Sequence, residues 1–222
     1  MRTLILTLLF AVNFSIHAET SEMFPESNKT ELRDISLGMH IENLPNNHFK
    51  NYICVNDKKG IDKLNNYKQC GSNKKGMYEV GLEFDTSDNE WAHNNESLEG
   101  TTVAGYPVIL SILIDENSLI QGIRAFTDPE ARSYLKRQAY LLSKRIKSHY
   151  GSSNWTCNKK EPGTDGNKPF GPVFIDERCT KVMKHKKVIV ESKFYRAPGQ
   201  SGKDYTNASS MEIVSLLSKQ TR

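Results

Sequence analysis

Alternating apolar and polar residues predict an antiparallel β-sheet with one face exposed to water. In residues 78–85 the even positions are apolar, and the odd positions carry three acidic residues and a glycine. Side chains alternate between the two faces of a strand, so this segment places its apolar side chains on one face. Residues 108–114 are apolar at nearly every position, which predicts a strand near the centre of the sheet. They form a hairpin with residues 119–126, and residues 173–182 and 188–196 predict a second hairpin.

Residues 128–150 predict one long amphipathic helix. Thr127 and Glu130 have the spacing of a capping box, and Pro129 suits the first turn, where its missing N–H would have no partner. Gly151 is a typical residue just after a helix end. We therefore expect an α+β fold, in which an antiparallel sheet of five or more strands carries this helix on one face. Residues 209–217 fit either a helix or a strand. The apolar stripe of the helix comprises Ala131, Leu135, Ala139, Leu142 and Ile146, widened by Tyr134 and Leu141.

The N-terminus has the pattern of a secretory signal peptide. Arg2 precedes an apolar run over residues 4–14, and Ala18 is the small residue after which cleavage is expected. The run is too short to span a bilayer, and no later apolar stretch is longer, so we expect no transmembrane segment after cleavage. The expected division is residues 1–18 as signal peptide, 19–30 as flexible leader and 31–222 as a single α+β domain, with 31–98 and 99–222 as alternative sub-halves.

The four cysteines predict disulfides, because an even number of cysteines in an exported protein is typical of disulfide bonding. Four cysteines allow three pairings. We favour Cys54 with Cys70 and Cys157 with Cys179, since each pair closes a short loop within one half of the chain. Each bridge then stabilises the fold by about 3 kcal/mol in the loop-entropy model. A zinc site is the alternative, but the spacings contain neither C-x-x-C nor a neighbouring histidine pair.

Composition and charge narrow the function classes. The 222 residues are 37% hydrophobic, with a mean hydropathy of −0.58, and are numerous enough to bury a substantial core. The 30 basic and 26 acidic residues give a net charge of +4, too little for a chain organised around nucleic acid. Export disfavours nucleic acid as well. The expected location is the periplasm or the extracellular medium.

A set of basic residues forms a candidate binding face on the predicted helix and second hairpin. If these two elements are neighbours, their side chains would face an anionic envelope component or an acidic protein. Alternatively, lysines at such positions keep a helix soluble and protect an edge strand from pairing. The candidate residues are Arg132, Lys136, Arg137, Lys144, Lys184 and Lys187.

The acidic loop after residue 85 is a candidate calcium site. Asp85, Ser87, Asn89 and Glu96 occupy positions 1, 3, 5 and 12 of a calcium-binding loop. However, Glu90 stands at position 6, where such a loop needs glycine, and a strand rather than a helix precedes it. A solvated acidic loop is the main alternative, and a transition metal held by His93 with Asp88 or Glu90 is a further one. No cofactor other than such a metal ion is expected.

No motif identifies a reaction. The chain lacks G-x-S-x-G, H-E-x-x-H, S-x-x-K and a phosphate-binding glycine loop. A triad could still form from distant residues, with Ser111 or Ser133 as candidate nucleophiles. Glu79 and Glu83 share a strand face and could act as paired carboxylates, but an exposed polar face is the favoured explanation.

Two resemblances concern short segments. The segment Leu37-Gly38-Met39-x-Ile41-x-x-Leu44-Pro45 resembles the opening of exported domains of the outer-membrane assembly lipoprotein family (SmpA/OmlA, BamE-like). The lipid-bearing cysteine of those lipoproteins is absent here. The layout that includes residues 104–108 and Trp155-Thr156-Cys157 is similar to uncharacterised exported proteins of proteobacteria. The first resemblance implies a binding role in the cell envelope, and neither implies site residues.

These observations favour an exported, disulfide-bonded binding protein that acts through a surface rather than a catalytic pocket. Its expected partner is a protein or an anionic envelope component. A secreted hydrolase with dispersed catalytic residues and a calcium-dependent binding protein are the two alternatives.

Overall fold

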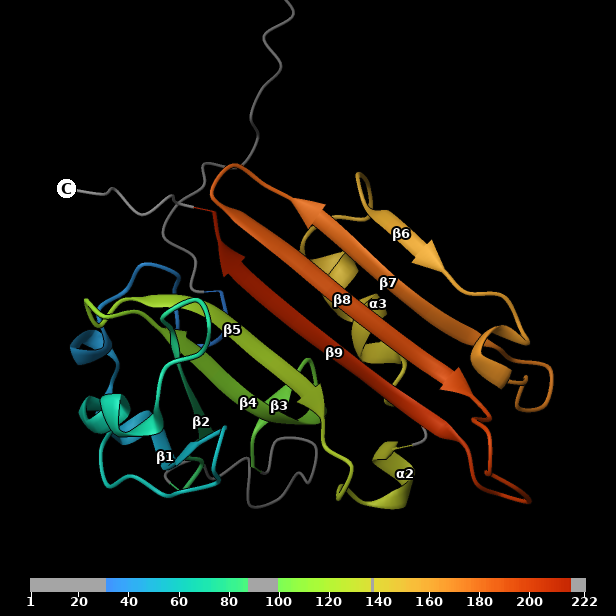
Figure 1. The fold of residues 1–222 in the computed structure, drawn as a ribbon, viewed down its shortest axis with the longest axis horizontal. Coiled ribbons are helices and arrows are strands. Elements are labelled where there is room, and N and C mark those ends of the chain that lie inside the picture. The colour runs from blue at the N-terminus through green and yellow to red at the C-terminus, as the bar shows by residue number, and fades with distance from the viewer. Residues whose placement is uncertain (1–30, 88–99, 137, 217–222) are drawn as a thin grey trace, which may run out of the picture.

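Nine β-strands dominate the secondary structure of the computed structural model, which describes residues 31–87, 100–136 and 138–216 (Figure 1). Eight of them form an antiparallel path in the order β1-β2-β4-β5-β9-β8-β7-β6, and β3 pairs with β4. The strands are β1 (Phe49–Cys54), β2 (Tyr78–Phe84), β3 (Thr102–Val103), β4 (Tyr106–Ile114), β5 (Ile120–Thr127), β6 (Thr156–Lys159), β7 (Ile175–Val182), β8 (Lys186–Tyr195) and β9 (Thr206–Ser215). The α-helices are α2 (Ser133–Lys136) and α3 (Leu141–His149), and the 3-10 helices are η1 (Ile41–Asn43), η2 (Asn46–His48), η3 (Leu64–Cys70) and η4 (Thr164–Gly166).

Two four-stranded meanders build the sheet and meet at their last strands. β1, β2, β4 and β5 lie side by side in chain order, and so do β6, β7, β8 and β9. β5 pairs with β9, with Ile123 opposite Ile213 and Arg124 opposite Glu212. The central pair of strands therefore joins residues 88 positions apart in the sequence.

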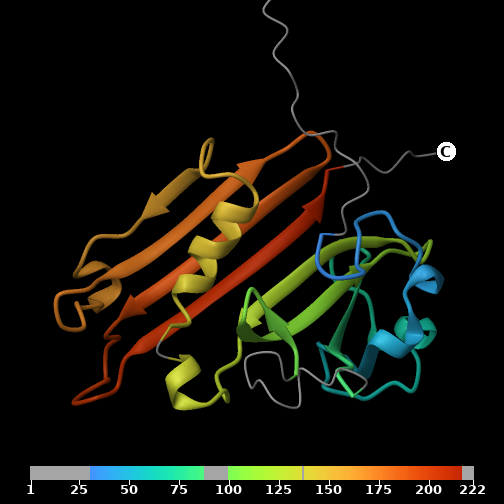
Figure 2. The same cartoon turned by 180° about the vertical axis from the view of Figure 1, so that it is seen from behind.

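One face of the sheet forms the hydrophobic core. The register places five fully buried side chains in one row across five strands: Val80, Ile112, Ile123, Ile213 and Val188. Full burial of one such aliphatic side chain stabilises the fold by roughly 1.5–3 kcal/mol. On the same face, α3 packs across β8 and β9, burying Leu142 and Ile146 in the core (Figure 2). η3 packs against β1 and β2 in the first meander.

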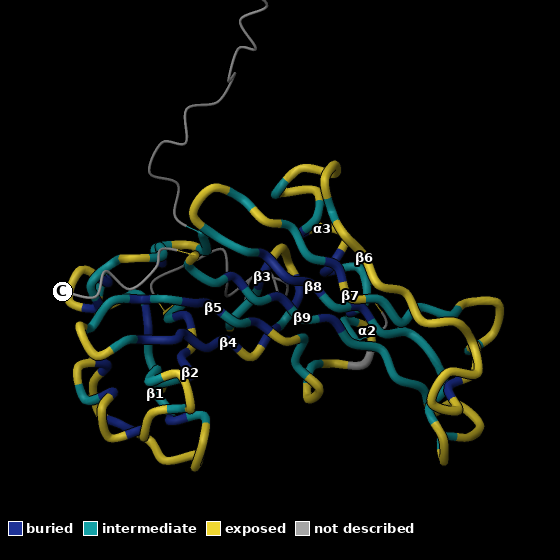
Figure 3. The backbone as a smooth tube through the Cα atoms, turned by 45° about the horizontal axis from the view of Figure 1, so that its top comes forward, coloured by how far each residue is buried: buried dark blue, intermediate teal, exposed yellow. Residues whose placement is uncertain are grey.

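The opposite face carries the alternate residues of the same strands, and we call it the open face. No described helix or strand covers β5, β9 and β8 on the side seen in Figure 1. One row across this face contains Ser111, Arg124, Glu212 and Ile189, which are neighbours in the strand register. Burial along the chain follows the sheet order, since β4 is mostly buried whereas the edge strand β6 is exposed throughout (Figure 3).

The predicted α+β fold with one long helix over 128–150 is wrong. The protein is mainly an antiparallel sheet, and the predicted helix is reduced to two short ones, α2 and α3. Thr127 does not cap a helix, because it ends β5 and its hydroxyl oxygen accepts a hydrogen bond from the Ser209 backbone N–H at 3.0 Å. The Asp128 carboxylate instead accepts a bond from the Glu130 N–H at 2.8 Å, which forms a tight turn after the strand.

The side chain of Asn207 on β9 accounts for the break between α2 and α3. In a continuous helix the Tyr140 N–H would donate to the Lys136 carbonyl, four residues earlier. Here Asn207 lies between these two groups: its amide oxygen accepts from the Tyr140 N–H at 2.9 Å, and its amide nitrogen donates to the Lys136 carbonyl at 2.6 Å. A side chain inserted into the helical ladder is a known cause of a break.

Other predicted elements are confirmed. The strand over 78–85, both hairpins and the central position of residues 108–114 are present. The ambiguous segment 209–217 lies largely in the strand β9, which pairs on both sides. Residues 1–30, for which a signal peptide and a flexible leader are predicted, lie outside the described residues. Within the described part of the chain, no helix is long and apolar enough to cross a membrane.

Candidate functional site

The two disulfides brace opposite edges of the sheet. Cys54 bonds to Cys70 and Cys157 to Cys179, as the sequence predicts. The first bridge ties the edge strand β1 to the end of η3, and the second ties the edge strand β6 to β7. All four sulfur atoms are oxidised, so none is a thiolate that could hold a metal or act as a nucleophile.

Only part of the candidate calcium loop falls within the described residues. Asn89 and Glu96 lie outside them, whereas Asp85 and Ser87 follow β2. The Asp85 carboxylate accepts a hydrogen bond from the Ser87 N–H at 3.0 Å and one from the Lys50 ammonium at 3.2 Å. These interactions, led by the backbone bond, lower the pKa of Asp85 to about 2. The carboxylate therefore already serves a local turn and an ion pair.

The five candidate basic residues that the structure describes do not share one surface. Lys144 is exposed on α3, which covers the core face of the sheet. Lys187 precedes the core residue Val188 on β8 and therefore belongs to the open face, on the other side. Lys184 is exposed in the turn between β7 and β8, Arg132 and Lys136 lie next to or in α2, and Arg137 is outside the described residues.

Three further basic side chains near this region have internal partners. Lys147 donates to the Glu177 carboxylate at 2.7 Å, and Lys186 donates to Glu31 at 2.8 Å. Lys181 donates to the Tyr150 carbonyl at the end of α3. These contacts hold the helix and the start of the described chain on the sheet.

A polar network occupies the centre of the open face. Arg124 Nε and Nη2 donate to Glu212 Oε1 at 2.9 and 2.7 Å, and Nη1 donates to Glu79 Oε2 at 2.8 Å. The Ser111 hydroxyl donates to Glu79 Oε1 at 2.8 Å. Ser111, a candidate nucleophile, is thus buried and bound to a carboxylate rather than to a histidine. The other candidate, Ser133, begins α2.

Burial and charge make this network unusual for an uncovered sheet face. The side chains of Glu79, Glu212 and Arg124 are only 12%, 26% and 31% exposed. Burial lowers the pKa of Arg124, but the hydrogen bonds and charges of Glu212 and Glu79 outweigh it and raise the pKa overall. Two carboxylates surround one guanidinium, so the network carries a net charge of −1. Within the described residues, Glu212 Oε2 accepts no hydrogen bond.

Exposed apolar side chains flank the network on the same face. Ile109 on β4 lies directly opposite Phe126 on β5, and they are 54% and 48% exposed. Val182, 66% exposed, belongs to the same face near the outer end of β7. The sequence pattern did not identify this combination of a polar network and exposed apolar side chains. The charged Arg124 within the otherwise mainly apolar segment 119–126 is the signal that could have indicated it.

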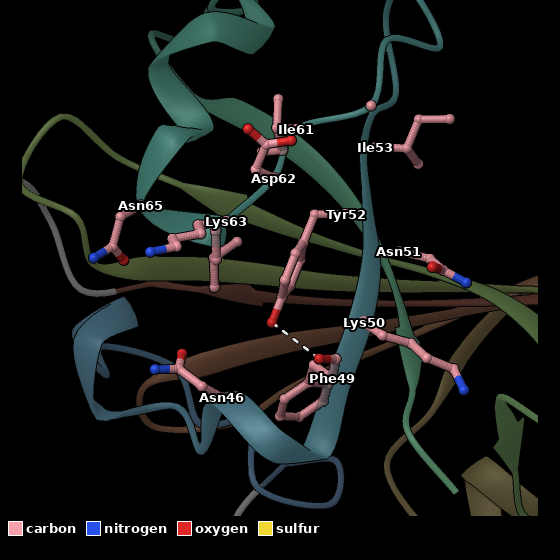
Figure 4. Close-up of a pocket in the computed structure, with 12 residues that line it drawn as sticks. Asn46, Phe49, Lys50, Asn51, Tyr52, Ile53, Ile61, Asp62, Lys63 and Asn65 are labelled. Carbon is pink, nitrogen blue, oxygen red and sulfur yellow. Dashed lines mark hydrogen bonds between the residues drawn. The ribbon is translucent and has the colours of Figure 1, made fainter. Parts of the chain in front are cut away.

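A hollow lies beside the edge strand β1. Its volume is about 760 Å³, and its apolar floor includes the buried side chains of Phe49, Ile61 and Leu64. Figure 4 shows Tyr52 between β1 and the segment that carries Lys63 and Asn65. We call this hollow the β1 cleft.

Comparison of the chain with protein-family models, with curated proteins and with solved structures finds no match.

Proposed function

We propose that this chain is an exported, disulfide-bonded protein-binding module that contacts its partner through the open face of the sheet. The observation that carries the proposal is the exposed pair Ile109 and Phe126 beside the Glu79–Arg124–Glu212 network. Exposed apolar side chains next to fixed polar groups are typical of protein interfaces, where aromatic and arginine side chains contribute most of the binding energy.

The charge pattern of the open face favours a protein over a polyanion or a membrane. Basic side chains on this face stand next to acidic ones: Arg178 pairs with Glu191, and Lys193 lies 3.8 Å from the same carboxylate. A polyanion would need a continuous positively charged surface. Lys144 and Lys187 do not provide one, because they lie on opposite faces of the sheet. Mixed charges around an apolar pair suit another protein surface.

The network also indicates the chemistry of the partner. Its net charge of −1, and a Glu212 Oε2 that accepts no hydrogen bond from the described residues, favour a partner that offers a lysine, an arginine or another hydrogen-bond donor beside an apolar side chain. A second copy of this chain is disfavoured, because docking around these centres would bring two net negative networks together. The three hydrogen bonds of Arg124 hold it in place before binding, which reduces the entropy lost on association.

Site-specific photo-crosslinking in the exporting cell tests this proposal. A photoreactive amino acid replaces Phe126 or Ile109, and the matched control replaces Lys144, which is exposed over the opposite face. We expect the same partner to be cross-linked from both open-face positions and not from the control. The purified partner should then bind the Phe126→Ser variant at least tenfold more weakly than the wild type, as for the loss of an aromatic interface residue.

The result that overturns the proposal is equally specific. Cross-linking of equal yield from Lys144, or unchanged affinity of the partner for folded Phe126→Ser and Ile109→Ser variants, would show that the open face is not the contact surface. Because both side chains are about half exposed, these substitutions leave the core intact, and circular dichroism verifies the fold.

A further inference from the structure

We infer that the β1 cleft binds an uncharged saccharide, independently of the open face. Its floor is apolar, its rim is polar, and one half-buried tyrosine stands between them. This combination fits a sugar ring, whose C–H face packs on an aromatic ring while its hydroxyl groups exchange hydrogen bonds with amides and charged side chains.

A β-bulge directs Tyr52 into the cleft. The pairing of β1 with β2 shifts register between Lys50 and Ile53, and Asn51 has a φ of 54°, in the left-handed region. The Asn51 amide donates to the Glu83 carboxylate at 2.8 Å, which holds the bulge from the open-face side. Bulges commonly re-aim a side chain next to a functional site. Here Tyr52 stands in the cleft, whereas Asn51 and Ile53 point away on the other side of the strand (Figure 4).

Tyr52 is held in a defined position. Its hydroxyl donates to the Phe49 carbonyl at 3.3 Å, and its backbone carbonyl accepts from the Ile61 N–H at 2.9 Å. Burial raises the pKa of Tyr52, so the phenol is neutral at physiological pH. A neutral, half-buried ring that is held in place and lines the cleft is suited to pack against a sugar ring.

The rim offers hydrogen-bonding groups without a net charge. Asn46, Asp62, Lys63 and Asn65 are exposed around the cleft, and within the described residues their side chains make no hydrogen bond or ion pair. The opposite charges of Asp62 and Lys63 cancel, and the nearby Lys50 is paired with Asp85 at 3.2 Å. A neutral polyhydroxylated ligand therefore fits better than an anion or a cation.

The two walls of the cleft are linked covalently. β1 forms one wall and ends at Cys54, while the other wall leads into η3, which ends at Cys70. The disulfide between these residues fixes the separation of the walls. A cleft braced in this way loses little conformational entropy when a ligand binds.

Saturation-transfer NMR with maltose, cellobiose and N,N′-diacetylchitobiose tests the inference on the purified mature chain. We expect at least one of these sugars to bind with a Kd of about 1 mM, the weak range typical of a small solvent-exposed site. Tyr52→Ala should weaken that binding at least tenfold, and Asn65→Ala a few-fold. The matched control is Tyr134→Ala, which removes an exposed tyrosine on α2 and should leave binding unchanged.

Two results would overturn the inference. One is the absence of saturation transfer from all three sugars to the wild-type protein. The other is binding that is equal in wild type and in folded Tyr52→Ala and Asn65→Ala variants. Photo-crosslinking from Phe126 is unaffected by either result, so the failure of this inference is distinguishable from the failure of the protein-binding proposal.

Discussion

Replacing Arg124 by leucine removes the cation that two partly buried carboxylates share. Among the described residues, Glu79 would keep only the Ser111 hydroxyl as a side-chain partner, and its side chain is 12% exposed. Removing one member of a fully buried ion pair costs about 3–5 kcal/mol. The members of this network retain some exposure, so solvent compensates in part, and we expect Arg124→Leu to lower the free energy of unfolding by about 2 kcal/mol.

Urea unfolding followed by tryptophan fluorescence measures this loss, and two comparisons test its cause. Adding Glu79→Gln to Arg124→Leu removes the unpaired charge but keeps the bond to Ser111, so the double variant should recover about 1 kcal/mol. The matched control is Arg178→Leu, whose side chain is 54% exposed and pairs with Glu191. This exposed pair should contribute less than about 1 kcal/mol. The reasoning fails if the control costs as much as Arg124→Leu, or if Glu79→Gln makes the double variant less stable than the single one.

Three further predictions concern the frame around the two sites. Cys157→Ser opens a bridge with a sequence separation of 22 and should lower the free energy of unfolding by about 3 kcal/mol in chemical denaturation. Asn207→Ala removes the amide that bonds the Lys136 carbonyl and the Tyr140 N–H, and should lower the free energy of unfolding by about 1–3 kcal/mol. A smaller loss is expected only if hydrogen exchange shows that α2 and α3 fuse into one helix. The lowered pKa of Asp85 means that its stabilising contribution is present above the ordinary pKa of 3.8 and lost as the pH falls towards 2. Asp85→Asn should therefore lower Tm at pH 7 more than at pH 2 in calorimetry.

The sequence pattern predicted the strands well, because apolar and polar residues alternate along a strand when only one face of the sheet is buried. Residues 78–85 alternate in the sequence and lie in β2 with the apolar side chains in the core. The disulfide pairing was also predictable, since each bridge closes a short loop within one meander. In both cases the deciding interactions lie close in the sequence or repeat with a fixed period.

The prediction of one long helix was wrong because the residue that interrupts the helix is distant in the sequence. Residues 128–150 satisfy the local rules for a helix, but Asn207 on β9 inserts its amide between the Lys136 carbonyl and the Tyr140 N–H. Nothing within the segment predicts this insertion. The same applies to the network, because Arg124 meets Glu79 and Glu212 at separations of 45 and 88 residues. Sites of this kind can be predicted only once the strand order is known.

The Glu79–Arg124–Glu212 network lies at the junction between the two meanders. Arg124 belongs to the first meander and Glu212 to the second, and they meet at the only pairing between the meanders among the described strands, β5 with β9. A chain cut between residues 98 and 99 would also separate β2 from β4, which pair directly. The open face thus forms only when both meanders are folded and joined. The β1 cleft lies within the first meander and needs no residue from the second. Loss of the β5–β9 pairing should therefore abolish partner binding at the open face before it affects sugar binding at the cleft.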